Sequence, residues 1–262
     1  MSDILHNNDY SRYFSLKQKV CLVNMSAGRD SEIYESLSGI VTSSGMNTVE
    51  LMVTLGGHGE YEDEVGKATY KLTSEALGSG IQVLADLTGI VSGNIFQFRM
   101  FGTLEMFQRR TVSRVEISVP SFHRCGNFSL SFFKKEWKRV MEHMRNKGGL
   151  SGLVLQESEI NLSAGGIGLM VDEKNRPTPL SMLFFAVDEG LPVCALVETV
   201  WEKRAEAGLR CGLRFIQILK SDQERINRFI SGLLKKSGNP HLDYKRNWVL
   251  VDKMVADLRP PE

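Results

Sequence analysis

Three arginines stand close together near the middle of the chain, at Arg109, Arg110 and Arg114. Their guanidinium groups repel one another unless an anion or a guanine base lies between them. Arginine suits both partners, because its planar fork binds phosphate oxygens or the O6 and N7 edge of guanine, and its face stacks on bases. Taken alone, the cluster is equally compatible with solvated surface charge.

A second polar motif lies about fifty residues further on, where Asn161 and Ser163 precede Gly165 and Gly166 in the pattern NxSxxG. The short polar side chains can hydrogen-bond a base edge or a ribose, and the glycines allow positive φ and close backbone approach. By itself this segment is also typical of an ordinary hairpin turn.

The charge of the chain is concentrated in one region. The 262 residues carry a net charge of +1, but residues 108–150 hold ten Lys or Arg and three acidic residues, a charge of +7. An anionic partner is therefore expected to bind one region rather than the whole surface. A general nucleic-acid binder would be more basic overall, so no nucleic-acid partner is predicted.

The segments before the arginines predict an all-β domain. Short β-branched or alternating runs recur between residues 15 and 100, separated by Gly, Ser and Asn clusters at spacings that favour a small antiparallel barrel or sandwich. Residues 56–60 (GGHGE) resemble a phosphate loop only superficially, because no Lys-Ser/Thr pair or helix pattern follows. We interpret them as a hairpin tip.

A second all-β unit is predicted after the arginines, with two helices. Phe133, Trp137, Val140, Met141 and Met144 recur at helical spacing, with lysines and arginines mostly on the other side, so residues 132–146 are expected to form a basic amphipathic helix. Ser221 and Glu224 form a capping-box pattern that predicts a further helix before residue 236. Residues 237–262 are expected to be a tail, with a possible helical stripe at Trp248, Val251, Val255 and Leu258.

Together and in this order, the RRxxxR cluster and the NxSxxG turn resemble the PilZ domain, whose signature is RxxxR followed by (D/N)xSxxG. Phe107–Arg110, Val119–Pro120, Val200–Trp201 and Gly212–Phe215 fit the same pattern. The first hundred residues resemble the amino-terminal barrel of flagellar-brake proteins of the YcgR type. The resemblance implies two antiparallel β-barrels in tandem, at residues 1–107 and 108–236, with a helical insertion at about 122–150.

The resemblance also implies a receptor for cyclic di-GMP, a dianion with two guanines, that regulates motility, pili or exopolysaccharide. Arg110 and Arg114 would bind guanine edges and phosphates, Arg109 would stack on a base, and an arginine at that position is associated with two intercalated ligands per chain. Asn161 and Ser163 would read the other guanine beside Gly165 and Gly166. Trp201 would flank the ligand, or else belong to the barrel rim.

Several alternatives remain open. One is a PilZ-like scaffold that acts through protein contacts alone, although such a scaffold has no evident reason to concentrate three arginines. Another is a receptor for a related dinucleotide such as cyclic GMP-AMP, which the sequence does not separate from cyclic di-GMP. The insertion could be a structural flap, a docking surface or a ligand lid. An enzyme is not expected, because the histidines are dispersed and no nucleophile elbow is present. Neither a metal nor any other cofactor is predicted.

The start of the chain and its hydropathy bear on where the protein works. No run of about 18 apolar residues and no signal-peptide core is found. A cytoplasmic protein without a membrane span is therefore predicted, with a protein target in motility or secretion machinery.

Overall fold

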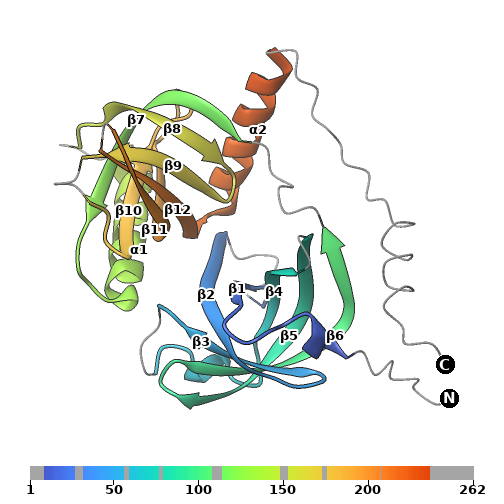
Figure 1. The fold of residues 1–262 in the computed structure, drawn as a ribbon. Helices are drawn as coiled ribbons and strands as arrows, with labels where there is room; N and C mark the ends of the chain where they lie inside the picture. The colour runs from blue at the N-terminus through green and yellow to red at the C-terminus, as the bar shows by residue number, and fades with distance from the viewer. Residues whose placement is uncertain are drawn as a thin grey trace.

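The first six strands close into an antiparallel barrel. The computed structural model describes residues 9–26, 32–55, 59–76, 79–107, 114–147, 153–172, 176–206 and 208–236. The strands follow the order β1-β4-β5-β6-β3-β2, and β1 pairs with β2 to complete the barrel (Figure 1). Their bounds are β1 Lys19–Asn24, β2 Ile33–Ser44, β3 Thr48–Val53, β4 Thr69–Ala76, β5 Ser79–Ser92 and β6 Ile95–Phe107, with 3-10 turns at Tyr10–Arg12 and Glu62–Glu64.

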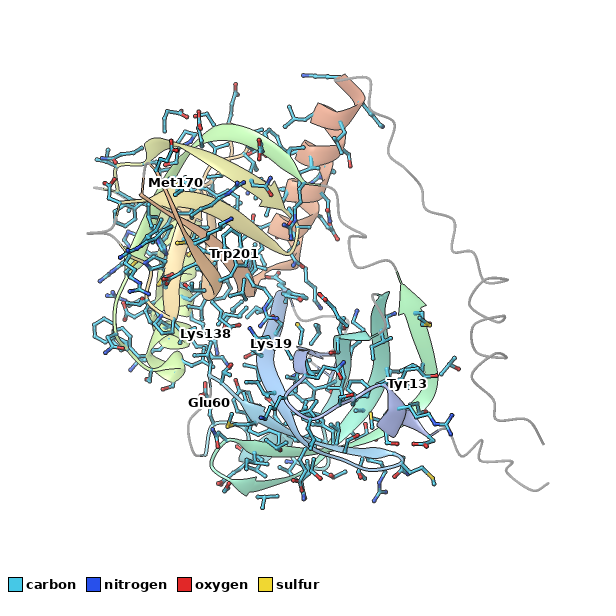
Figure 2. The ribbon with its side chains drawn as sticks, in the orientation of Figure 1. Tyr13, Lys19, Glu60, Lys138, Met170 and Trp201 are labelled. Atoms are coloured by element: carbon cyan, nitrogen blue, oxygen red, sulfur yellow. The ribbon has the colours of Figure 1, made fainter. Side chains whose placement is uncertain are left out.

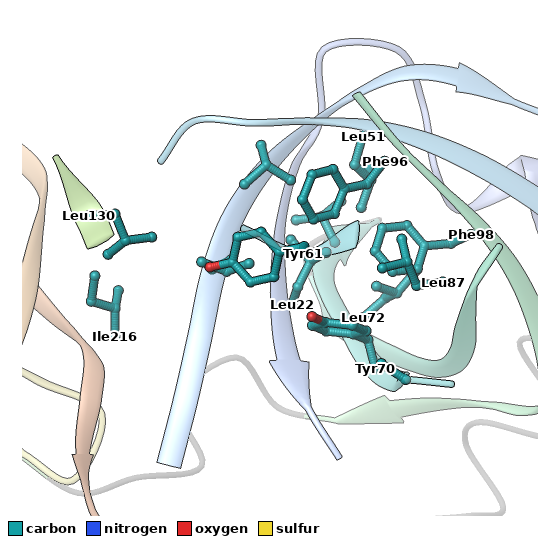
Figure 3. Close-up of a cluster of buried hydrophobic side chains, with 14 of the residues drawn as sticks. Leu22, Leu51, Tyr61, Tyr70, Leu72, Leu87, Phe96, Phe98, Leu130 and Ile216 are labelled. Atoms are coloured by element: carbon teal, nitrogen blue, oxygen red, sulfur yellow. The ribbon is translucent and has the colours of Figure 1, made fainter. Parts of the chain in front are cut away.

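Alternation of apolar and polar residues explains the core of this barrel. In β3, Val49, Leu51 and Val53 are buried, while the residues between them point outward. Edge-to-face aromatic pairs add to the core, with Tyr70 and Phe98 having ring centroids 5.5 Å apart. Figure 3 shows Leu51, Tyr70 and Phe98 among the side chains gathered inside the barrel.

The second six strands form another closed antiparallel barrel. Their order is β12-β11-β10-β7-β8-β9, and β9 pairs with β12 to close the ring. The elements are β7 Val115–Cys125, α1 Leu130–Lys147, β8 Gln156–Ser163, β9 Gly166–Val171, β10 Leu180–Phe185, β11 Val193–Ala205, β12 Gly208–Leu219 and α2 Lys220–Lys236.

Helix α1 covers the outside of the second barrel at β10 and β11. All six residues of β10 are buried, because Leu183 and Phe185 face the barrel core while the alternate residues pack in the same cluster as α1. The Trp137 indole is 1% exposed and donates from Nε1 to the Cys194 carbonyl over 2.9 Å. The predicted apolar face of this helix is therefore the face that packs.

The two barrels are joined through β2 and β12. Three residue pairs continue the sheet from one barrel into the other, with Glu35 opposite Gln217, Tyr34 opposite Ile218 and Ile33 opposite Leu219. The buried hydroxyl of Ser36 donates to the Phe215 carbonyl over 3.1 Å. Leu130 and Ile216 extend the first core cluster toward the second barrel (Figure 3).

One lysine of α1 belongs to this junction. Lys134 forms an ion pair with Glu35, lies 3.5 Å from a Glu60 oxygen, and donates to the Tyr61 hydroxyl over 2.9 Å. The helical spacing predicts lysines and arginines mostly opposite the apolar face, and Lys134 differs from Lys135 and Lys138 because three polar partners from the first barrel surround it. Helix α1 thus holds the two barrels together.

The prediction of an all-β protein with two tandem barrels, a helical insertion and a C-terminal helix is confirmed. Helix α1 spans Leu130–Lys147, slightly beyond the predicted 132–146. Helix α2 begins at Lys220, so Ser221 lies within the first turn rather than at the cap. The tail 237–262 and residues 56–58 of the GGHGE segment lie outside the described residues, and the division at 107/108 stays a prediction.

Candidate functional site: a cationic pocket on the second barrel

A cavity of about 640 Å³ lies on the outer face of the second barrel, over β8, β9, β11 and β12. It brings together six of the eight residues that the sequence singled out: Arg114, Asn161, Ser163, Gly165, Gly166 and Trp201. Arg109 and Arg110 lie outside the described residues. The volume is in the range typical of sites for small organic ligands.

Glycines form the floor of the pocket. A Cβ atom on Gly166 would lie 2.3 Å from the Leu213 carbonyl oxygen, so any side chain there would collide with the neighbouring strand. Gly168 of β9 and Gly212 of β12 are directly paired across the sheet, and neither covers the backbone with a side chain. The Trp201 indole lies over Gly212, so a flat ligand can approach the sheet closely beside that indole, at Gly168.

The NxSxxG motif forms the hairpin between β8 and β9. Ser163, which is buried, donates its hydroxyl proton to the Gly166 carbonyl over 3.0 Å and so fixes the turn. Its oxygen still has acceptor capacity for a ligand N–H. The Gly165 carbonyl accepts from the Phe215 amide over 3.1 Å, which ties the turn to β12.

Four cations line the described part of the pocket: Arg114, Lys203, Arg210 and Arg214. No aspartate or glutamate is among its described lining residues. Arg210 lies 3.5 Å from Glu116, but both side chains are more than half exposed, so this pair neutralises little. The pocket therefore presents a positive potential to an anionic ligand.

Sequence reasoning missed Lys203, Arg210 and Arg214. In the segment Arg210-Cys211-Gly212-Leu213-Arg214 the cations alternate with buried residues, so both arginines and Gly212 share one face of β12. That alternation is the signal that could have assigned the arginines to the same surface as the motif turn.

Trp201 forms an aromatic wall of the pocket. A register shift between Thr199 and Trp201 sets the strand so that Trp201 pairs with Gly212. The indole occupies the space that a Gly212 side chain would take, since its Nε1 would lie 2.1 Å from a Cβ there. Trp201, which is labelled in Figure 2, is 45% exposed, which leaves part of the indole open to stacking.

Helix α1 contributes no residue to the described lining of this pocket. It packs on β10 and β11 and on the first barrel, outside the described lining. Its partly exposed cations, including Lys135 and Lys138, face away from its packed side.

The described residues contain no group of three or more His, Cys, Asp or Glu side chains that could hold a metal ion. Within the same part of the chain, neither helix is long and apolar enough to cross a membrane.

Comparisons with known proteins agree with the motifs. Residues 108–232 match the family model described as the PilZ domain. No curated protein matches the sequence. Among solved structures, the chain is similar to the Bacillus subtilis inhibitor of motility MotI/DgrA, with a TM-score of 0.35, 11% identity, and coverage of 86% of this chain and 99% of that one.

Two further structures are similar at the same level. YcgR from Escherichia coli in complex with c-di-GMP has a TM-score of 0.32 and 15% identity, over 84% of this chain and 85% of that chain. MrkH from K. pneumonia in its apo state has a TM-score of 0.36 and 15% identity, over 85% and 90% of the two chains. On the match to the family model, residues 108–232 are a PilZ domain, and an amino-terminal β-barrel precedes it in the chain.

Proposed function

We propose that this protein is a receptor for cyclic di-GMP, and that ligand binding changes the relation between its two barrels. The observation that carries the proposal is the pocket on the second barrel, where four cations, the NxSxxG turn and a half-exposed tryptophan surround a glycine floor. Cations bind the phosphates, the turn reads a base, and the indole stacks on one.

The residue roles follow from the motif match and the pocket chemistry. Arg110 and Arg114 bind guanine edges and phosphates, and Arg109 stacks on a base. Asn161 and Ser163 contact the second guanine, Gly166 keeps the turn open beside Gly165, and Trp201 flanks the ligand. The described pocket lining holds no carboxylate, imidazole or thiol to act as a general base, which favours a receptor over an enzyme.

The charge of the pocket favours two ligands per chain. Two cyclic di-GMP molecules carry four negative charges. Of the four described cations that line the pocket, Arg214 is already paired with Glu198, while Arg114, Lys203 and Arg210 remain, and Arg109 and Arg110 precede Arg114 in the sequence. Titration calorimetry should therefore give a stoichiometry of two, and Arg109→Leu should reduce it to one. A wild-type stoichiometry of one that Arg109→Leu leaves unchanged would contradict this part of the proposal.

The central test is the same titration with the Arg114→Ala variant and a panel of cyclic dinucleotides. Loss of bidentate charge-assisted contacts should weaken cyclic di-GMP binding by about 2 kcal/mol or more, which is roughly 30-fold. Arg228→Ala, an exposed arginine on α2, is the matched control and should bind as wild type does. Tighter binding of cyclic GMP-AMP, or no binding of any dinucleotide, would favour the alternative receptor or the ligand-free scaffold respectively.

The change in interdomain geometry has its own test. The linker between β6 and β7 contains the arginines, so a ligand that binds them acts on the segment that joins the barrels. Small-angle scattering with saturating cyclic di-GMP should differ from the apo curve, and Arg114→Ala should abolish the difference. Identical curves despite proven binding would contradict the geometric part and leave the receptor part intact. The output is proposed to be a protein target in motility, pilus or polysaccharide machinery.

A further inference from the structure

Arg214 lies at the wall between two cavities. It lines the pocket described above and also a second cavity of about 560 Å³, which residues of both barrels line, among them Gln18, Ser38 and Thr73 from the first. In the β9–β12 register Arg214 is directly opposite Gly166, beside the motif turn. Its position thus connects the ligand pocket with the junction of the barrels.

A carboxylate and a hydroxyl hold this arginine. Nη2 of Arg214 lies 2.5 Å from Oε2 of Glu198, and the same oxygen accepts a hydrogen bond from the Ser38 hydroxyl over 2.7 Å. The Glu198 side chain is 11% exposed, so these partners replace most of the water that would otherwise solvate the carboxylate. One of them, Ser38, comes from β2 of the first barrel.

The guanidinium has donor capacity left. Its Nε is buried and has no hydrogen-bond partner among the described residues. A guanidinium offers five N–H donors in a fixed fork, so contact with Glu198 leaves others for an acceptor in the pocket. A buried donor without a partner is unfavourable. The Arg214 side chain is 24% exposed and lines the pocket, so its other N–H groups can reach a ligand oxygen there.

We propose that Arg214 is a further ligand-binding residue, and that Glu198 and Ser38 position it, so that the first barrel contributes to ligand affinity. The inference rests on the proposed function. The ligand binds the free donors while Nη2 stays on Glu198, because full withdrawal of Arg214 would leave a nearly buried carboxylate unpaired. This coupling is reciprocal. If the Ser38 contact raises the affinity for the ligand by a given factor, the bound ligand stabilises the Ser38 contact by the same factor.

The first experiment removes both charges together. The double variant Glu198→Gln/Arg214→Gln keeps the net charge and leaves no unpaired buried ion. We expect it to bind cyclic di-GMP at least about tenfold more weakly than wild type in a calorimetric titration. Arg176→Gln/Glu202→Gln removes an ion pair of 2.7 Å outside the pocket and should change the affinity less than about twofold.

The fold of the variant is controlled separately. If the double variant loses its cooperative thermal transition, Arg214→Lys replaces it, since lysine keeps the charge but lacks the fork and should still weaken binding about fivefold. Wild-type affinity in a folded double variant, or in Arg214→Lys, would overturn the proposal.

The second experiment concerns the first barrel. Ser38→Ala should weaken cyclic di-GMP binding about threefold in the wild-type background and have no effect in the Glu198→Gln/Arg214→Gln background. A merely structural role of Ser38 would give the same effect in both backgrounds, which would overturn the positioning role. Absence of binding to the wild type would instead refute the proposed function, and this inference with it.

Discussion

Lys134 allows the junction between the barrels to be tested with one substitution. Its ammonium lies among Glu35, Glu60 and Tyr61, all from the first barrel, and the side chains of Lys134, Glu35 and Glu60 are only 19%, 23% and 18% exposed. In Lys134→Met the two carboxylates would face each other without a cation. Apart from the ion pair with Lys134, Oε1 of Glu35 is buried and has no hydrogen-bond partner among the described residues.

The expected cost follows from this burial. Removing one member of a fully buried ion pair destabilises a protein by about 3 to 5 kcal/mol, and partial exposure lowers that figure to about 2 to 3 kcal/mol here. The measurement is the free energy of unfolding from urea denaturation, followed by circular dichroism at neutral pH. Lys138→Met, on the exposed face of the same helix, should cost less than about 0.5 kcal/mol.

A double variant separates charge from packing. Adding Glu35→Gln to Lys134→Met removes one of the uncompensated carboxylates and should recover about 1 kcal/mol or more. The reasoning is refuted if Lys134→Met proves as stable as Lys138→Met. It is also refuted if the double variant loses the sum of the unfolding free energies that the two single variants lose, because the ion cluster then does not hold the barrels together.

Four further substitutions test individual contacts. Burial lowers the pKa of His123 from 6.5 to about 4, so the folded protein binds this proton later than the unfolded chain as the pH falls. The stability that the neutral imidazole contributes is complete above pH 6.5 and is lost as the pH falls from 6.5 toward about 4. Between pH 7.5 and 5, wild type should therefore lose about 2 kcal/mol more unfolding free energy than His123→Gln. Equal losses in the two proteins would refute this. Gly166→Ala should destabilise by about 2 kcal/mol because its Cβ meets the Leu213 carbonyl, whereas Gly165→Ala, with open space around it, should be nearly neutral; thermal melts that rank them otherwise would contradict the steric argument. Trp137→Phe leaves the Cys194 carbonyl without its donor and should lower the unfolding free energy by about 1 to 3 kcal/mol, a cost that an unchanged urea midpoint would rule out.

The barrels could be predicted because their strands carry local signals. Alternation such as that of Val49, Leu51 and Val53 identifies a half-buried strand from sequence alone. The apolar spacing of Phe133, Trp137 and Met144 likewise predicts the packed face of α1. What covers that face depends on tertiary packing, so the surroundings of Lys134 could not be predicted from the periodicity.

The residues of the site could likewise be predicted only in part from the sequence. Asn161, Ser163 and Gly166 lie in one hairpin, so a local motif places them together. Arg210 and Arg214 join them only because β12 pairs with β9 and closes the barrel. Barrel closure depends on pairing between strands far apart in sequence, which residue spacing cannot predict. The sequence shows only that Arg210, Gly212 and Arg214 share one face of β12.

The pairing of β2 with β12 affects how the chain can be divided for study. Ser36 and Phe215 are 179 positions apart in sequence, so this contact has a high contact order and forms only after both barrels have brought their strands close. A fragment that begins at residue 108 would leave the end of β12 as an uncovered edge, with Ile216 and Ile218 nearby. Such an edge favours self-association, so a truncated PilZ domain should form oligomers that the full chain does not form.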